Sequence, residues 1–520
     1  MKKLSYITIL AASMAFCSCS DFLDVKPVGK LIPTQIDEYE KLLNNTSTLD
    51  NFMLDNNRNC SYAFLGDNLQ ISESQAIGNY TATFPNLDML AAYIGYYPIY
   101  PSNSTPLSWS YGIFRALSYF NNVIDGVSSI DTKSTEAKSV IAQAMVGRAW
   151  IYMHAALCYG PMYDPNGAND TKVLPLRTSG DPTQSNGPLA TTKQIFEQVK
   201  ADLDYACENC PVNIGNPSRA NLACAYALRA EYDMYVRDWT AMAADAKMAW
   251  ETALKDKGGV DNMLYNYADF YYEATSVVDP AEGEDEEVYM TLRHKTDTKF
   301  ERTDNREDLL YRNTPYNYSA SRFYPSQDWL DLFDETDLRA QKFIFSELGY
   351  SKVLSDGTRL DDGIQKFDYR GNNIKQTAAL TYPLLLLMKA EAEARTNKLS
   401  EALTSLNLLR QYRYQDGAAL KGGSSLSQDQ LINEILNERR REAPLVSFQR
   451  TLDLKRFILD GAKPWVKNTI THYIGSKSYT LNVANDEAYK HLPIDNAVLK
   501  YNPQWGIEPV TTTFEPYNAW

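Results

Sequence analysis

The sequence has 520 residues, 44% hydrophobic and 22% charged, a composition typical of a globular protein with two or three domains or subdomains. A net charge of −14 without a basic stripe argues against a nucleic-acid ligand and against strong attraction to anionic lipid. Tyrosine is unusually common, with 36 copies. Because its ring is apolar and its tip polar, tyrosine suits surfaces that bind partly polar ligands, although most of these rings are expected in helix packing.

The first residues have the anatomy of a secretory signal. Two lysines precede an apolar run over residues 4–16, which is too short to span a bilayer. No A-x-A site follows; Cys19 stands directly behind the small residue Ser18, whereas a bulky phenylalanine precedes the rival Cys17. This ending resembles a bacterial lipobox, with residues 1–18 as the signal peptide and Cys19 as the lipidated first residue. An ordinary signal with incidental cysteines is the alternative. Lipidation would anchor the protein without spanning the membrane.

The other cysteines form no recognisable framework. They are Cys60, Cys158, Cys207, Cys210 and Cys224. An odd number without regular spacing is unlike a disulfide scaffold. The CxxC spacing of Cys207 and Cys210 has no second pair and the four histidines are scattered, so a zinc site lacks ligands. A local disulfide and two unreactive thiols both stay open for this pair, and no metal or other cofactor is expected.

Helical periodicity dominates the middle of the chain. The expected helices are 141–159, 191–207, 219–236, 239–254, 376–395 and 399–413. Apolar residues recur at i, i+4 and i+7 in two of them, as Trp239, Ala243 and Ala246 and as Leu399, Leu403 and Leu406. Helix pairs of this kind resemble tetratricopeptide units, although the two copies lie about 160 residues apart. The sequence predicts a mostly α fold, in which tetratricopeptide-like helix pairs form a scaffold with long irregular loop insertions and little β structure.

Two long insertions interrupt the helical pattern, at residues 45–106 and 256–326. Both are polar, weakly periodic and rich in Gly, Pro, Asn and Tyr. Long irregular segments inside a compact domain are typically functional or disordered, and the tyrosine content argues against disorder. We therefore expect the insertions to carry function. The apolar run at 381–388 has the length of a buried helix, not of a membrane span.

The sequence lacks the common nucleophile, phosphate-binding and zinc-protease motifs. Glu438 and Glu442 lie one turn apart on an expected helix and enclose three arginines. They could be catalytic carboxylates, but neighbouring charges on one helix more often form ion pairs that tie elements together, and we favour that interpretation. The acidic loop at 356–363 does not have EF-hand spacing, which leaves calcium as a minor alternative.

Several segments, taken in chain order, resemble the SusD/RagB family of outer-membrane lipoproteins of Bacteroidetes. The matches run through Cys19 to Asp24 with Pro27, Trp109 to Asn122, Arg148 to Pro161, Ser218 to Ala220, Tyr324 to Arg339, Tyr382 to Arg410, Glu438 to Arg456 and Leu492 to Pro503. Each motif is weak alone, but the ordered set is specific and covers nearly the whole chain. There are two departures from the family pattern: residues 444–449 read PLVSFQ where Phe-Glu-Gly-His is usual, and Asp495 replaces the last proline of Leu-Pro-Ile-Pro.

The resemblance implies a lipid-anchored protein on the surface of the outer membrane that is not an enzyme. Family members bind oligosaccharides, or in some cases peptides, and sit as lids on SusC-type TonB-dependent transporters that import the nutrient. The expected division is a signal peptide (1–18), an N-terminal region with the helix pairs and insertions (19–320) and a C-terminal SusD/RagB region (321–520). The alternatives are a peptide-binding subunit of the same family, a glycoside hydrolase and a purely structural helical scaffold.

Six tyrosines in the insertions are the candidate ligand-binding residues, because flat rings stack on the apolar faces of sugars while nearby polar groups bind the hydroxyls. They are Tyr96, Tyr97, Tyr100, Tyr311, Tyr316 and Tyr318. The first three fall in a proline-bounded loop before Trp109, and the others in the second insertion. Trp329 lies in an apolar, helix-like pattern and is expected in the core. No catalytic or metal-binding residue is expected.

Overall fold

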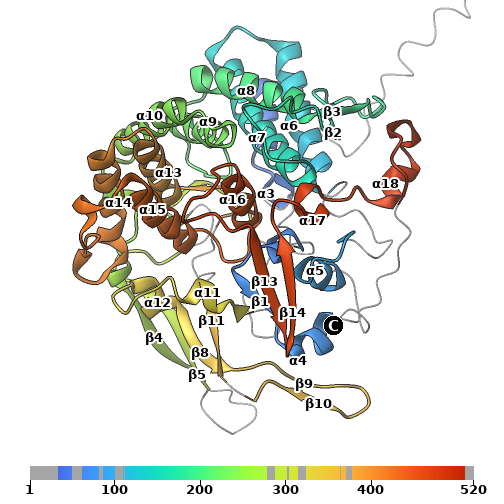
Figure 1. The fold of residues 1–520 in the computed structure, drawn as a ribbon. Coiled ribbons are helices and arrows are strands. Elements are labelled where there is room, and N and C mark those ends of the chain that lie inside the picture. The colour runs from blue at the N-terminus through green and yellow to red at the C-terminus, as the bar shows by residue number, and fades with distance from the viewer. Residues whose placement is uncertain are drawn as a thin grey trace, which may run out of the picture.

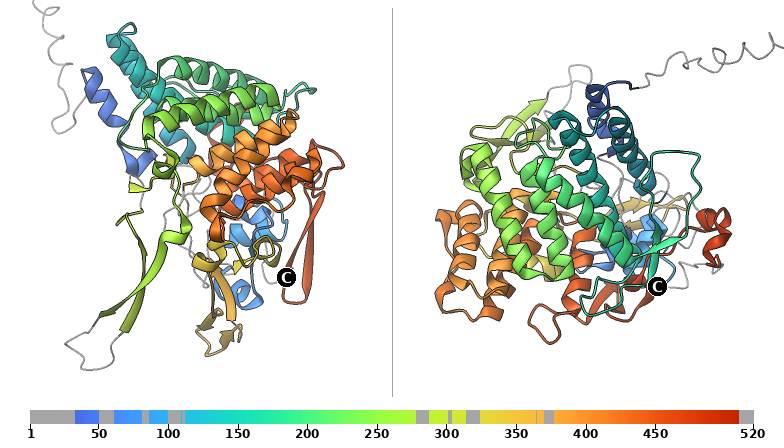
Figure 2. Two further views of the ribbon diagram at one scale, coloured as in Figure 1. Left: turned by 90° about the vertical axis from the view of Figure 1, so that its left-hand side faces the viewer. Right: turned by 90° about the horizontal axis from the view of Figure 1, so that it is seen from above.

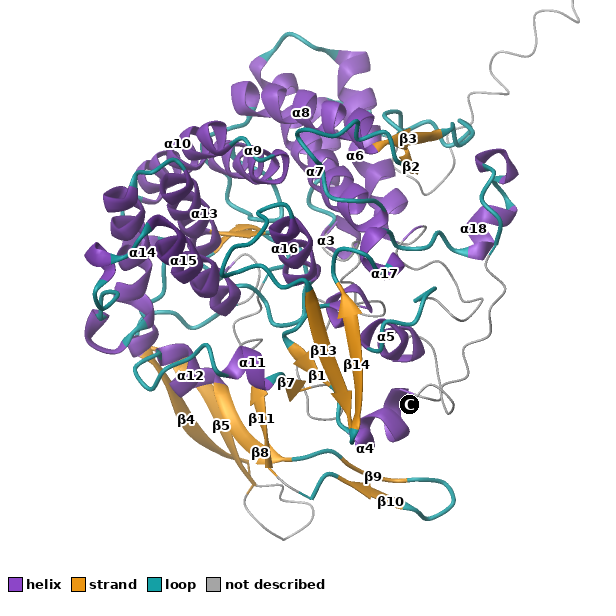
Figure 3. Ribbon diagram, viewed as in Figure 1, coloured by secondary structure: helices purple, strands orange, loops and turns teal. Residues whose placement is uncertain are grey.

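The computed structural model describes residues 33–49, 61–80, 86–99, 109, 112–277, 287–300, 304–313, 324–363, 365–369 and 377–509. Cys19, Tyr100, Tyr316 and Tyr318 lie outside the described residues. Helices account for most of the described chain, and strands occur as short pairs (Figures 1 and 3). The predicted fold class, mostly α with little β structure, is confirmed.

The helical body is a series of helices that pack on their neighbours (Figure 1). They are α6 (Phe114–Ile130), α7 (Thr135–Tyr159), α8 (Thr192–Asn209), α9 (Leu222–Val236), α10 (Trp239–Lys257), α13 (Tyr382–Arg395), α14 (Leu399–Arg413), α15 (Gln428–Glu442) and α16 (Phe448–Ile458). Helix α9 pairs with α10 and α13 with α14, while α10 packs against α13. The two predicted pairs therefore exist, and although they are distant in sequence they share an interface.

The turns inside these two pairs are built alike. Arg237 follows α9 with a φ of 65°, and Asn397 follows α13 with a φ of 62°. A left-handed residue at this place lets the chain leave one helix and start the next within a few residues. Asp238 then caps α10 by accepting the N–H of Ala241 at 3.0 Å.

The start of α13 differs from the prediction. The periodicity predicted a helix from residue 376, but α13 begins at Tyr382, because Leu380 and Thr381 form a short strand, β12 (Leu380–Thr381), which pairs with β6 (Asp308–Leu310). Thr381 caps the helix through the N–H of Leu384 at 3.2 Å, and Pro383 occupies the first turn, where its missing N–H costs no hydrogen bond. The end of α14 at Arg413 agrees with the prediction.

The strands of the described residues form two-stranded antiparallel sheets. Besides β6–β12, they are β1 (Leu69–Gln70) with β7 (Tyr324–Pro325), β2 (Lys172–Pro175) with β3 (Leu189–Thr191), β4 (Phe270–Val277) with β5 (Glu287–His294), β8 (Ile344–Leu348) with β11 (Gln365–Tyr369), β9 (Ser351–Val353) with β10 (Arg359–Asp361), and β13 (Thr469–Ile474) with β14 (Lys477–Asn482). The β4–β5 hairpin extends away from the helical body (Figure 2).

Short helices complete the described elements. They are α2 (Ile36–Leu42), α3 (Thr46–Leu49), α4 (Glu73–Gln75), α5 (Asn86–Tyr93), α11 (Gln327–Leu330), α12 (Leu338–Phe343), α17 (Glu487–Lys490) and α18 (Asn496–Lys500), with 3₁₀ or π turns at η1 (Ser61–Leu65), η2 (Ala76–Tyr80), η4 (Val260–Asn262), η5 (Tyr267–Asp269), η8 (Gln415–Gly417), η9 (Gly423–Ser425) and η10 (Pro503–Trp505). Trp329 of α11 is fully buried, as expected for a core residue.

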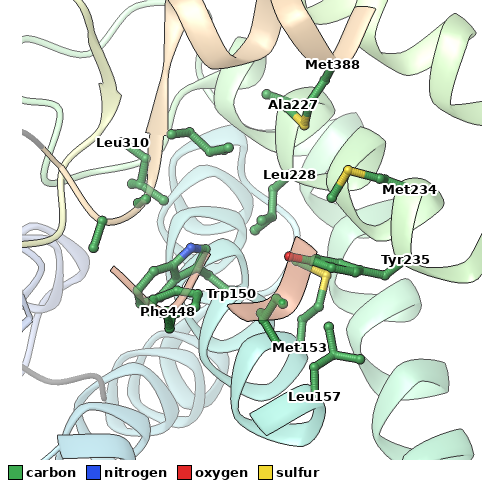
Figure 4. Packing of buried hydrophobic residues seen from close by; sticks show 14 of the residues in the cluster. Trp150, Met153, Leu157, Ala227, Leu228, Met234, Tyr235, Leu310, Met388 and Phe448 are labelled. Atoms are coloured by element: carbon green, nitrogen blue, oxygen red, sulfur yellow. The ribbon is translucent and has the colours of Figure 1, made fainter. Parts of the chain in front are cut away.

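One hydrophobic core runs through the molecule. Helix α7 is buried along most of its length, and Figure 4 shows Trp150 of α7 beside Phe448 of α16, with ring centroids 6.2 Å apart. Tyr235 of α9 and Leu310 of β6 belong to the same cluster. None of the helices in the described ranges is both long and apolar enough to cross a bilayer.

Residues 61–80 are fastened to the C-terminal part of the chain by the buried charge of Asp67. Asp67 accepts two hydrogen bonds from Arg450 of α16, at 2.6 and 2.9 Å, and a third from Lys467 at 2.8 Å. Arg440 of α15 lies 3.2 Å from the same carboxylate. The hydrophobic core and these ion pairs therefore both join residues on either side of position 320, the expected boundary between the N-terminal and C-terminal regions.

Candidate ligand-binding face

The turn after α5 presents Tyr96 and Tyr97. Gly95 has a φ of 71°, its N–H donates to the carbonyl of Ala92 at 3.1 Å, and the N–H of Tyr96 donates to the carbonyl of Ala91 at 2.8 Å. This pair of bonds is a Schellman motif, which needs a left-handed residue and therefore favours glycine. Both tyrosines after the turn are half-buried, and the Tyr97–Pro98 peptide is cis.

Tyr93, the last residue of α5, holds this turn against β13. Its ring stacks on the imidazole of His472, with centroids 4.1 Å apart, and its hydroxyl donates to the carbonyl of Tyr473 at 3.1 Å. The ring nitrogens of His472 lie 2.5 Å from the carbonyl oxygen of Tyr93 and 2.9 Å from that of Gly66. The C-terminal hairpin thus fixes the position of the two tyrosines of the N-terminal insertion.

Tyr97 meets His491, the residue after α17. Their rings contact edge to face, with centroids 5.6 Å apart. Burial raises the pKa of the Tyr97 hydroxyl to about 12, and the carboxylate of Glu487 adds to the shift. Burial lowers the pKa of His491. At neutral pH both side chains are therefore uncharged, and the tyrosine keeps a proton that it can donate.

A second aromatic group surrounds Trp109. Its ring lies 4.8 Å from that of Phe114, 5.5 Å from that of Tyr159 and 5.9 Å from that of Trp505, measured between centroids. Trp109 is buried, whereas Trp505 is half-buried and donates its indole N–H to the carbonyl of Gly187 at 3.0 Å. Trp505 and Phe114 are therefore the rings of this group that reach the surface, whereas Trp109 and Tyr159 are enclosed.

The two groups are joined through the end of α7. The N–H of Leu492, next to His491, donates to the carbonyl of Cys158 at 2.9 Å, and Cys158 precedes the Tyr159 that contacts Trp109. We call the surface formed by Tyr96, Tyr97, His491 and Trp505 the aromatic face; Trp109 is buried and packs against Trp505.

The remaining candidate tyrosine within the described residues, Tyr311, is not on this face. Its side chain is fully buried, its hydroxyl donates to Asn313 at 3.1 Å, and its N–H donates to the carbonyl of Pro217 at 2.7 Å. A ring with no exposed surface cannot stack on a sugar, so Tyr311 serves packing in this structure. Tyr96 and Tyr97 are brought together.

The carboxylates of Glu438 and Glu442 form ion pairs with arginines. Arg339 lies 2.6 Å from each of the two carboxylates, and Arg413 lies 2.7 Å from Glu442. Burial alone would raise the pKa of Glu438, but Arg339 and two further arginines outweigh it and hold the pKa at about 2. A general acid of a glycosidase needs a raised pKa. The preferred interpretation of this motif, ion pairs that join separate elements, is confirmed.

The other polar motifs are structural. Cys207 and Cys210 are free and buried, which supports two unreactive thiols and not a local disulfide. Burial also raises the pKa of Cys207 to about 12. Asp356 accepts the N–H of Thr358 at 2.9 Å in the β9–β10 turn. Across the described ranges, no three His, Cys, Asp or Glu side chains are arranged to hold a metal ion.

Two family models match the chain. One, described as starch-binding associating with outer membrane, matches residues 21–232, and the other, described as the SusD family, matches residues 382–505. The chain belongs to the SusD/RagB family. No curated protein sequence matches it. The residues of the aromatic face all lie within the two matched ranges.

Solved structures have the same fold. A SusD-like carbohydrate binding protein from Bacteroides vulgatus has a TM-score of 0.59 at 16% identity, over 93% of this chain and 100% of that one. A SusD superfamily protein from Bacteroides fragilis has a TM-score of 0.59 at 17% identity, over 90% and 99%. Surface glycan-binding protein A from Bacteroides uniformis has 0.54 at 15%, over 90% and 97%. At such identities the likeness concerns the SusD fold alone.

Sequence reasoning missed His491 and Trp505 as members of the aromatic face. Both fall in the C-terminal segment that resembles the closure of SusD/RagB chains, which the sequence marked only as a structural motif. The signal that could have found them is the concentration of aromatic residues there, with Tyr489, Tyr501 and Trp505 close together in the sequence. Their proximity to Tyr97 and Trp109 depends on tertiary packing.

Proposed function

We propose that this protein is a surface lipoprotein that captures an oligosaccharide and delivers it to a SusC-like TonB-dependent transporter. The observation that carries the proposal is the aromatic face, where half-buried rings lie on rigid elements of the scaffold. Family membership supports it, because solved SusD-type relatives are named a SusD-like carbohydrate binding protein and a surface glycan-binding protein.

The chemistry of the aromatic face suits a neutral sugar. Tyr97 and His491 are uncharged at neutral pH and offer ring surface and hydrogen-bonding groups, while the charge of the neighbouring Glu487 is balanced by its ion pair with Lys490. Sugars combine apolar C–H faces with hydroxyl groups, which match a ring and its polar tip. The backbone that carries Tyr96 and Tyr97 is already held by the Schellman turn and by the stacking of Tyr93 on His472, so little ordering is needed when a ligand binds.

Anchoring through Cys19 completes the proposal. A lipid on Cys19 would hold the protein at the membrane without embedding it, as a lid on a transporter requires. A Cys19→Ala protein should leave the membrane fraction and still bind the ligand in solution, and loss of binding with the fold intact would contradict this separation.

Catalysis has no part in the proposal. The carboxylate pair that most resembles a glycosidase pair, Glu438 and Glu442, is buried and ion-paired with arginines. Purified protein should therefore bind the glycan without releasing reducing ends. Steady release of reducing sugar by an activity that co-purifies with the protein would favour the hydrolase alternative.

The test starts from a glycan array and a casein-peptide library, followed by calorimetry with the best binder. The Tyr96→Ala/Tyr97→Ala variant should bind about tenfold more weakly or worse, because a few central rings carry most of the energy of a binding site. Tyr205→Ala, a half-buried tyrosine of α8 outside the aromatic face, is the matched control and should bind normally. Unchanged affinity of the double variant would reject the aromatic face, and binding of peptides alone would favour the peptide importer.

A further inference from the structure

A hollow of about 790 Å³ opens at the turn between α9 and α10. Its lining includes Tyr163, Tyr232, Arg237, Trp239 and Thr240. The volume falls in the range of small-molecule sites, about 300–1,000 Å³. The lining contains none of the residues that define the aromatic face, and helices α9, α10 and α13 lie across the molecule from α5 (Figure 1).

Two tyrosine rings of the hollow are fixed by a common buried neighbour. Tyr163 stacks on Phe196 of α8, with centroids 5.0 Å apart and planes 27° from parallel. Tyr232 of α9 lies 5.6 Å from the same ring, and Phe196 is buried. Both tyrosines are half-buried. The arrangement holds two flat rings at the wall of the hollow, and neither ring is part of the aromatic face.

The charges of the hollow cancel within the protein. Arg237 and Arg395 both bind the buried carboxylate of Asp460, at 2.7 and 2.9 Å. Burial would raise the pKa of Asp460, but the hydrogen bonds from these arginines and from Trp465 hold it at about 2, so the carboxylate is ionised. With Asp238 at the rim, two positive charges face two negative ones. The hollow therefore offers no net charge to attract a free ion.

Hydrogen-bonding groups are nevertheless left over. Within the described part of the chain, the hydroxyls of Tyr163, Tyr232 and Thr240 make no hydrogen bond. Arg237 uses only Nη2 toward Asp460, which leaves Nε and Nη1 available. Asp238 uses Oδ1 to cap α10 and has a second carboxylate oxygen. Donors and acceptors thus lie beside exposed ring surface.

We propose that this hollow is a second carbohydrate site, which takes a neutral stretch of oligosaccharide. A neutral sugar matches all three properties: its C–H faces cover Tyr163 and Tyr232, its hydroxyls meet the free donors and acceptors, and it brings no charge into a charge-balanced site. The inference rests on the proposed function only for the class of ligand, because it needs none of the residues of the aromatic face. Two sites on one chain would also raise the apparent affinity for a long glycan.

The test measures the affinity and stoichiometry of the full chain by calorimetry, with maltoheptaose, cellohexaose, xylohexaose and mannohexaose as probes and a casein digest as the peptide arm. Unaltered protein should bind two molecules of at least one of these sugars. The Tyr163→Ala/Tyr232→Ala variant should bind one, while Tyr96→Ala/Tyr97→Ala should keep the site in the hollow. Tyr226→Ala is the matched control, a half-buried tyrosine of α9 outside the hollow, and should still bind two.

The outcomes separate the two proposals. A single site that disappears only in Tyr96→Ala/Tyr97→Ala overturns the second site and keeps the first. Binding that disappears only in Tyr163→Ala/Tyr232→Ala supports the hollow and rejects the aromatic face. If no sugar binds, or only the peptides bind, both proposals fail. Should the alanine variant not fold, Tyr163→Phe/Tyr232→Phe retains the packing on Phe196 and should weaken the second site severalfold; unchanged affinity would overturn it.

Discussion

Replacing Asp67 by asparagine should destabilise the protein strongly. The carboxylate of Asp67 is 8% exposed and lies within 3.2 Å of nitrogen atoms of Arg450, Arg440 and Lys467. The amide keeps the shape of the side chain but removes its charge. Arg440 and Lys467 retain Asp328 as a partner, whereas Arg450 loses the one carboxylate within ion-pair distance among the described residues.

The magnitude follows from that loss. Removing one partner of a buried ion pair typically costs about 3–5 kcal/mol, because the other charge stays buried without compensation. An asparagine oxygen can still accept one hydrogen bond from Arg450, so we expect about 3 kcal/mol. Asp67→Asn with Arg450→Met should lose less than Asp67→Asn alone, because the double variant leaves no uncompensated guanidinium.

The assay is urea unfolding followed by circular dichroism, repeated at decreasing pH. Burial raises the pKa of Asp67, but the three cations, Arg450 first, outweigh it and hold the pKa well below 3.8. The stabilisation is thus present above the unfolded pKa and is lost as the pH falls through the lower folded value, so the variant should show a shallower acid loss. Asp37→Asn, which breaks the exposed pair with Lys41, is the control and should have no measurable effect. A loss below about 1 kcal/mol for Asp67→Asn would refute the reasoning.

Three further predictions concern the packing around the aromatic face and the core. Gly95→Ala should cost about 1–2 kcal/mol in unfolding free energy, because a side chain is strained at φ 71° and its Cβ would lie 3.0 Å from Leu481. Gly258→Ala is the control and should cost less, because Gly258 has a similar φ of 75° but open space around it. An equal cost for the two variants would show that the contact with Leu481 is irrelevant. Iodoacetamide should modify Cys224 only after urea is added, because burial raises its pKa to about 12; rapid labelling of the native protein, read by mass spectrometry, would contradict this. Burial lowers the pKa of Lys455 from 10.5 to about 8, so between these pH values the unfolded chain binds more protons than the folded one. The free energy of unfolding should therefore rise with pH in this range, and Lys455→Met should abolish the rise. A rise that persists in the variant would show that another group causes it.

The helix pairs could be predicted because their signal is local. The spacing of Leu399, Leu403 and Leu406 repeats once per turn, and the helix found there has the predicted ends. The start of α13 could not be predicted, because it depends on the pairing of Leu380 with Leu310, 70 positions earlier, and periodicity carries no record of that contact. Pro383 was the available local hint.

The candidate site was less predictable, because residue type does not encode exposure. Tyr97 and Tyr311 both occur in polar, tyrosine-rich insertions, yet one ring lies half-buried at the surface and the other is fully enclosed. What separates them is tertiary: Tyr311 is fastened to Pro217, whereas Tyr97 follows a glycine turn that ends a helix. His491 joins Tyr97 from almost 400 positions away.

The bond between Asp67 and Arg450 has a consequence for biogenesis. The two residues are 383 positions apart, and the ion-pair partners of Asp67 among the described residues all lie at or beyond Arg440, so Asp67 stays unpaired until most of the polypeptide has been made. Non-local contacts of this kind form late, because loop closure must precede them. Asp67 must therefore wait for the C-terminal part of the chain before its charge is compensated. A purified chain truncated before residue 440 should leave residues 61–80 sensitive to protease, whereas the full chain should protect them.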